Sequence, residues 1–225
     1  MKKAFTMAEV LITLGILGVV IAFTLPILME GYRKQVVETR LARFYSVINQ
    51  AVLRSEVDNG SKEYWDKSFA GWQLDENGLE DRTKPSYPAL WYDKYLKKYL
   101  KTLEVKQEQS ESGKIILYFE DGSCVLISSA SIIFYPDAKY YEAVVEEENG
   151  MHRDKNLAGT KFFDFEWNPK KGIEPYTSGW DGTRNNLLNS NSLGCKKEVT
   201  NERAYCTKLI QMNGWKIPKD YPLRF

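Results

Sequence analysis

The chain has 225 residues, with 31 basic and 30 acidic side chains and a net charge of +1. This balance excludes a sequence-wide electrostatic field that would attract nucleic acid or anionic lipid. A hydrophobic fraction of 43% with 27% charged residues excludes a disordered chain. The length suits one core with a long appended element, or two small domains.

The first predicted element is an apolar helix. Residues 10–29 carry no charge, and an apolar run of about 18 or more residues is long enough to cross a bilayer as a helix. Everything after Glu30 mixes polar and apolar residues. The chain therefore divides into an apolar anchor and a soluble body.

Three interpretations compete for this N-terminal segment. A cleaved secretory signal peptide needs a shorter apolar region and a small-x-small cleavage site, but bulky side chains occupy residues 27–29. A plain signal anchor explains Lys2 and Lys3, because positive charge stays cytoplasmic and the body is then placed outside. Neither interpretation explains Glu9, since a carboxylate at the edge of a membrane helix costs free energy. Its partner is expected to come from another molecule.

The third interpretation rests on a motif. Residues 2–10, KKAFTMAEV, resemble the prepilin cleavage and methylation motif of type IV pilins and type II secretion pseudopilins. In that family a short basic leader ends in a small residue, and a membrane peptidase cuts before a phenylalanine whose new amine is methylated. A glutamate stands four residues beyond that phenylalanine. Ala4, Phe5 and Glu9 match these positions, although the family usually has glycine before the cut and larger aliphatic residues at 7–8.

The resemblance also implies roles along the apolar helix. Gly18 matches the glycine at which the helix melts in assembled filaments, and Pro26 matches a proline late in the span. Proline lacks an N–H and disrupts a helical hydrogen bond, so the helix is expected to stretch there when a subunit leaves the bilayer. Glu9 is expected to pair with the Phe5 amine of a neighbouring subunit. Removing one partner of a buried ion pair costs about 3–5 kcal/mol.

The helical period continues beyond Glu30. Apolar residues recur at three- and four-residue steps, namely Val37, Leu41, Phe44, Tyr45, Ile48 and Val52. One continuous helix is predicted over residues 5–57, and Asn59-Gly60 is its expected stop. The second half is predicted to pack on a sheet, with a coiled coil as the alternative.

The body is predicted to be α+β, with an antiparallel sheet. Residues 60–85 read as a loop-rich insert that carries Trp65, Phe69 and Trp72. Short helices are expected over residues 88–100 and 204–213, and strands over residues 114–119, 123–128, 131–135, 141–147 and 161–167. A long helix followed by such a sheet is also the order that the resemblance to pilins implies. The predicted divisions are a leader over residues 1–4, a membrane-spanning and assembly half of the helix over 5–29, an amphipathic half over 30–57 and a globular body over 58–225.

The cysteines are Cys124, Cys195 and Cys206, and an odd number leaves at least one thiol outside any bridge within the chain. Three pairings are open. The pair Cys195–Cys206 is favoured, because the two lie close together around a polar segment, provided that the body faces an oxidising compartment. Cys124 lies in an apolar run and is predicted to be a buried, inert thiol.

Candidate chemistry in the body is sparse. The single histidine, His152, lies in a polar segment and is predicted to be on the surface, which argues against a zinc site or a catalytic triad. Asp164 and Glu166 alternate along a predicted strand. A glycosidase pair is one interpretation of them, and the solvated face of the strand is the other. No catalytic residue is assigned, and the protein is predicted not to be an enzyme.

Calcium is the one cofactor that the resemblance raises, because some pseudopilins hold it with oxygens of C-terminal loops. The candidate ligands are Asp181, Asn185, Asn186 and Asn189. Their spacing matches no known calcium loop. No metal ligand is therefore assigned.

The resemblance implies a pilin-like filament subunit of a type II secretion or type IV pilus system. Its partners would be a prepilin peptidase, other pilin or pseudopilin subunits and an inner-membrane assembly platform. No nucleic acid is expected unless the system takes up DNA. The chain would be a single-pass inner-membrane protein with its body outside the cytoplasm, and later part of a periplasmic or surface filament. The alternatives are a membrane-tethered binding protein or adhesin that does not polymerise, and a secreted hydrolase; Glu9 and Pro26 favour the filament subunit.

Overall fold

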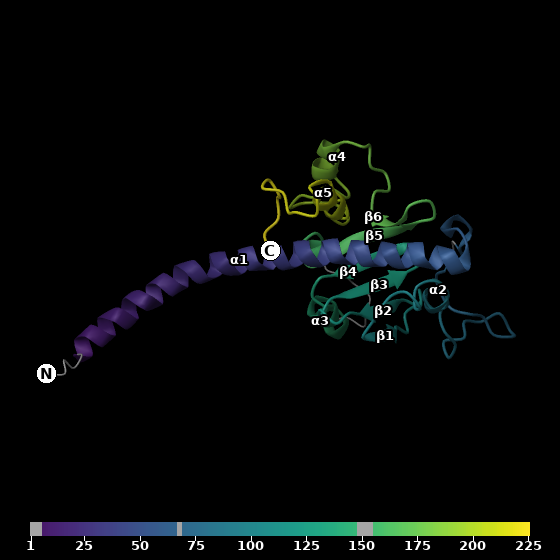
Figure 1. The fold of residues 1–225 in the computed structure, drawn as a ribbon, viewed down its shortest axis with the longest axis horizontal. Coiled ribbons are helices and arrows are strands. Elements are labelled where there is room, and N and C mark those ends of the chain that lie inside the picture. The colour runs from purple at the N-terminus through teal and green to yellow at the C-terminus, as the bar shows by residue number, and fades with distance from the viewer. Residues whose placement is uncertain (1–5, 67–68, 148–154) are drawn as a thin grey trace.

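The long N-terminal helix dominates the molecule. The computed structural model describes residues 6–66, 69–147 and 155–225. Helix α1 (Met7–Asn59) has 53 residues. Its first half projects away from the body, and its second half lies across the sheet (Figure 1). The predicted continuous helix is confirmed, and it ends at Gly60, whose φ of 73° suits glycine.

The body contains one six-stranded sheet in the order β1-β2-β3-β4-β5-β6, with every neighbouring pair antiparallel. The strands are β1 (Glu104–Gln107), β2 (Ile115–Tyr118), β3 (Cys124–Ser128), β4 (Ser131–Tyr135), β5 (Phe163–Asn168) and β6 (Gly172–Pro175). The short helices are η1 (Lys62–Tyr64), α2 (Tyr87–Tyr95), α3 (Lys139–Glu147), η2 (Lys155–Leu157), α4 (Arg184–Asn189) and α5 (Cys206–Met212). The predicted α+β class is confirmed.

The second half of α1 packs on one face of this sheet. The apolar stripe predicted from the sequence is buried at Val37, Leu41, Phe44, Ile48 and Val52. The ring of Phe44 stacks on that of Phe134 with centroids 4.3 Å apart. Such aromatic contacts contribute about 0.5–1.5 kcal/mol beyond the area that they bury. The stripe therefore packs on a sheet and does not form a coiled coil within the chain.

A polar clamp fixes α1 to the edge of the sheet. The Asn49 amide nitrogen donates to the Ile173 carbonyl at 2.8 Å, and the Ile173 N–H donates to the Asn49 oxygen at 3.0 Å. These two bonds satisfy backbone groups of β6 that an edge strand would otherwise leave open. A Cβ atom added to Gly172 would lie only 2.5 Å from the Asn49 Oδ1 atom, which is too close. Glycine is thus required beside the clamp.

The other face of the sheet is covered as well, and this overturns two sequence predictions. Residues 141–147 were predicted as a strand but belong to helix α3, and Asp137, just before this helix, accepts from the Lys139 N–H at 3.2 Å. Tyr141 packs against Tyr135 on this second face. Asp164 was predicted to lie on a solvated face but is buried. Polar and apolar residues that alternate along a strand indicate a solvent-exposed face only when one face of the sheet is uncovered.

Candidate functional site

The first half of α1 is the most unusual surface of the molecule. Residues 6–26, 28 and 29 are all exposed, and they include large apolar side chains such as Leu11 (68% exposed) and Phe23 (73% exposed). Monomeric soluble proteins rarely expose a contiguous apolar surface of this extent. By length and composition, α1 can cross a membrane.

Polar groups within this apolar half are satisfied locally. The Thr13 hydroxyl donates to the Val10 carbonyl at 2.9 Å, and the Thr24 hydroxyl donates to the Val20 carbonyl at 2.9 Å. The hydrocarbon core of a bilayer has no water that could hydrogen-bond an unsatisfied polar group. Hydrogen bonds within the helix therefore suit a helix in this environment. The threonines are therefore compatible with an apolar environment.

Glu9 forms a capping box with Thr6 at the start of α1. The Glu9 Oε2 atom accepts from the Thr6 N–H at 2.8 Å and from the Thr6 hydroxyl at 2.9 Å, and the Glu9 N–H donates to the Thr6 Oγ1 at 3.3 Å. A carboxylate in the first turn also interacts favourably with the helix dipole. In the single chain, Glu9 thus has a partner within its own helix. The predicted processing residues Ala4 and Phe5 lie outside the described residues.

Gly18 and Pro26 both lie inside α1, which continues through them. The missing N–H of Pro26 removes the hydrogen bond that a helix would make to the Ala22 carbonyl. Cβ atoms added at Gly15 or Gly18 would meet nothing within 4 Å. No contact within the chain therefore requires glycine at either position, and each lowers helix stability by about 1 kcal/mol relative to alanine.

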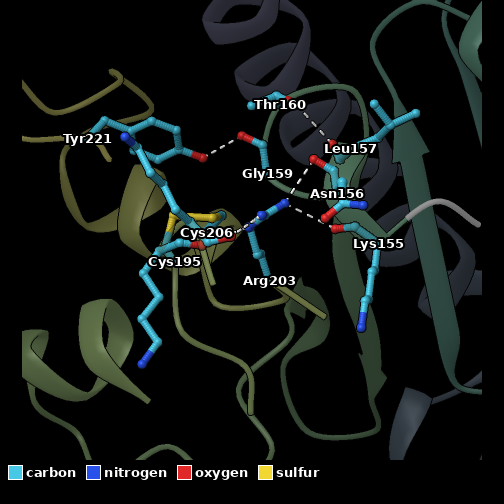
Figure 2. Close-up of a disulfide and its surroundings, with 11 residues drawn as sticks. Lys155, Asn156, Leu157, Gly159, Thr160, Cys195, Arg203, Cys206 and Tyr221 are labelled. Carbon is cyan, nitrogen blue, oxygen red and sulfur yellow. Dashed lines mark hydrogen bonds between the residues drawn. A yellow bond between two sulfur atoms is a disulfide. The ribbon is translucent and has the colours of Figure 1, made fainter. Parts of the chain in front are cut away.

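A second candidate region lies at the C-terminal end of the body (Figure 2). Cys195 and Cys206 form a disulfide with Cα atoms 4.7 Å apart, which is the pairing favoured from the sequence. Gly159 lies against it, since a Cβ there would stand 2.4 Å from the Cys206 sulfur. Cys124 is buried, and burial raises the pKa of its thiol to about 12. It is inert as a nucleophile, because the thiolate is the reactive form.

Arg203 ties the disulfide-bounded loop to the rest of the body, as Figure 2 shows. Its guanidinium donates to the Lys196 carbonyl at 2.7 Å and to the Asn156 carbonyl at 2.8 Å. It also donates to the carbonyls of Lys155 and Lys197. Only 7% of Arg203 is exposed. No sequence signal reveals this residue, because its partners are backbone atoms of distant segments.

Three of the four candidate calcium ligands make local hydrogen bonds through their side chains. Asp181 accepts from the Thr183 N–H and hydroxyl, both at 2.8 Å, and Asn189 donates to Asn185 at 2.8 Å. Asn185, Asn186 and Asn189 belong to α4, and Asp181 precedes the Thr183 cap of this helix. Within residues 6–66, 69–147 and 155–225, no group of three or more His, Cys, Asp or Glu side chains is arranged to hold a metal. His152 lies outside the described residues.

The proposed glycosidase carboxylates are also not arranged as a pair at an open site. Glu166 accepts from the Thr177 N–H at 3.0 Å and from its hydroxyl at 3.2 Å, which fixes the segment after β6. Asp164 is buried under the second face of the sheet. General acid catalysis requires access to a sugar ring, and a buried carboxylate lacks that access.

Together, the bare apolar helix and the packed sheet define an α+β protein whose helix can be inserted in a membrane. Residues 27–225 match the model of DUF6613, a family of unknown function, and the chain belongs to this family. The match covers the body and the second half of α1, and it leaves out residues 1–26, which hold most of the apolar run. No curated protein and no solved structure matched the chain.

Proposed function

We propose that this protein is a pilin-like, non-enzymatic filament subunit of a type II secretion or type IV pilus system. It is matured by a prepilin peptidase, anchored in the inner membrane with its body outside the cytoplasm, and assembled through α1. One observation carries the proposal: α1 is a single helix whose first half is bare and apolar, with an acid, Glu9, in its first turn.

The two halves of α1 support a subunit that moves between two apolar environments. The second half is committed to the body through the buried stripe around Phe44. The first half has no partner in the described chain. Lipid covers this apolar surface before assembly, and the helices of neighbouring subunits cover it afterwards. Because both surroundings are apolar, the transfer costs little hydrophobic free energy.

Glu9 supplies the specific step in this scheme. Before assembly its carboxylate is held by Thr6, a cap that contributes about 1 kcal/mol. In a filament the carboxylate would exchange this cap for the Phe5 amine of a neighbouring subunit. An unpaired charge in that apolar surrounding would be costly, so only the register that pairs the two groups is favoured.

Mass spectrometry of the mature protein tests the processing. A chain that begins at methylated Phe5 is the expected result. An intact Met1, or a cut after residue 25, would contradict the proposal. The alternative of a tethered binding protein or adhesin predicts the same anchor without any need for methylation.

Three variants then separate the roles of the Glu9 charge and the Thr6 cap. Glu9→Ala and Glu9→Gln should be cleaved normally but absent from filaments, as measured by immunoblot of sheared filaments against the membrane fraction. Thr6→Ala, the matched control, removes the same cap but keeps the carboxylate, so it should be incorporated. Incorporation of Glu9→Gln at the normal level would rule out the ion pair.

A further inference from the structure

A groove opens at the point where α1 enters the body. It has a volume of about 350 Å³ and lies between α1, the start of α3, the segment before β5 and the C-terminal residue Phe225. In Figure 1 the C-terminus lies beside α1, next to the projecting half of the helix. This groove therefore lies next to the end of the apolar run, from which Met29 contributes to its lining.

The lining of this groove is strongly basic. Arg33, Arg40, Lys139 and Lys161 contribute four cationic side chains, against the carboxylate of Asp137 and the terminal carboxylate that Phe225 carries. Asp137 pairs with Lys139 at 2.7 Å. Four cations with two carboxylates leave an excess of two positive charges around the groove.

Among residues 6–66, 69–147 and 155–225, Arg33 and Lys161 form no ion pair with a carboxylate. Arg33 makes no hydrogen bond or ion pair with the part of the chain that the structure describes, and it is exposed. The Lys161 ammonium lies 5.0 Å from the centre of the Tyr140 ring, as does that of Lys139. Asp137 raises the pKa of Lys139, while the charge of Arg33 acts against that rise. Like charges thus face one another across the groove, which favours an anion between them.

A neighbouring groove shows that this imbalance is local. It is lined by Arg40, Arg43 and Lys101 together with Glu120 and Asp121. There Lys101 pairs with Glu120 at 2.8 Å, and Arg43 lies 3.4 Å from Asp121. Its charges are largely compensated, and it offers no comparable site for an anion.

The position of the basic groove selects the source of the anion. Twenty apolar residues at 1.5 Å per residue span about 30 Å, the thickness of a bilayer's hydrocarbon core. If residues 10–29 fill that core, Arg33 lies one helical turn above it, among the lipid headgroups. Tyr32, also in the lining, is of a type enriched at this interface. The inference thus rests on the membrane anchor proposed above.

We propose that this groove binds the phosphate of an anionic phospholipid in the extracytoplasmic leaflet. Arg33, Lys139 and Lys161 hold the phosphate oxygens, for which guanidinium and ammonium groups are suited donors. Met29, at the lower end of the lining, contacts the start of an acyl chain. One bound lipid would then set the height and rotation of the body on the membrane before assembly.

Native mass spectrometry of the full chain, released from detergent containing equal amounts of phosphatidylglycerol and phosphatidylcholine, tests this site. The wild type should retain phosphatidylglycerol preferentially. The triple variant Arg33→Gln/Lys139→Gln/Lys161→Gln should lose that preference by roughly tenfold or more, since each basic residue near a lipid surface adds to the attraction. The matched control, Arg54→Gln/Lys97→Gln/Lys101→Gln, removes three charges at other surface positions and should behave as the wild type.

Three outcomes would overturn the lipid site: equal retention of both lipids by the wild type, an equal loss in the control variant, or binding of inorganic phosphate with no gain for phosphatidylglycerol. A second measurement tests the membrane anchor separately from the lipid headgroup site. The protein is mixed with pure phosphatidylcholine vesicles, and its flotation with them is measured after an alkaline wash. If the wild type does not float, the anchor fails. If it floats but shows no lipid preference, only the headgroup site fails.

Discussion

Glu108 is a half-buried carboxyl through which pH acts on the body. Burial raises its pKa above the ordinary value of 4.5, against the opposing charge of Lys114. The Tyr141 hydroxyl donates to Oε1, while Oε2 lies 3.8 Å from the Lys114 ammonium, too far for a hydrogen bond. The carboxylate is thus incompletely compensated, and it lies where α3 meets the sheet.

The sign of the pH dependence follows from that shift. The folded state binds the proton of the Glu108 carboxyl more tightly than the unfolded state does. The stability that this proton contributes is therefore complete below pH 4.5, and it is lost as pH rises through the folded-state pKa of Glu108. Glu108→Gln keeps an acceptor for Tyr141 and carries no charge. We expect the variant to gain stability relative to the wild type between pH 4.5 and pH 7, as measured by urea unfolding at a series of pH values. An unchanged difference across this range would contradict the assignment.

At the scale of single elements, α1 combines a rigid packed half with a weakened apolar half. Pro26→Ala restores one hydrogen bond and should stabilise the helix by about 3 kcal/mol. Hydrogen exchange of residues 18–26 should slow in this variant, and assembly should fall if the helix must stretch there. Gly31→Ala, just beyond the apolar run, is the control: it strengthens the helix but should leave assembly unchanged. Equal exchange in Pro26→Ala and the wild type would show that Pro26 is not the weak point.

The sequence predicts some elements better than others, for physical reasons. The 3.6-residue period of α1 is long, so its packed stripe around Leu41 and Phe44 could be read directly. Strand β6 and the edge strand β1 were missed, because each has four residues and β6 contains glycine and proline. Helix α3 was mistaken for a strand, since its place on the second face depends on contacts with Tyr135 and Glu108.

The candidate sites divide in the same way. Glu9, Gly18 and Pro26 were predicted from a local motif whose spacing along one helix needs no tertiary information, and their roles in assembly stay predictions. Arg203 and the basic groove could not be identified, because they form only when segments distant in sequence come together. The excess of positive charge in that groove also cannot be inferred from the composition, because the whole chain has a net charge of only +1.

At the scale of the whole molecule, the buried core of the body lies entirely beyond the apolar run. The first buried apolar residue is Val37, and the core continues from there to Ile210. The C-terminal tail is fixed to α1 beyond the span, because Glu38 accepts from the Ile217 N–H at 2.9 Å and pairs with Lys216 at 2.9 Å. None of these contacts uses a residue before Glu30.

This separation predicts how a truncated chain behaves. A fragment that begins at Glu30 keeps the whole core and loses only exposed apolar surface, so it should be soluble and monomeric by size-exclusion chromatography. Its midpoint of urea unfolding should match that of the full chain in detergent, since none of the deleted residues that the structure describes belongs to the buried core. A second fragment that begins at Phe44 is the control: it lacks Val37, Leu41 and the Glu38 contacts, and it should unfold or aggregate. Aggregation of the Glu30 fragment would instead mean that the first half of α1 contributes to the fold as well as to the anchor.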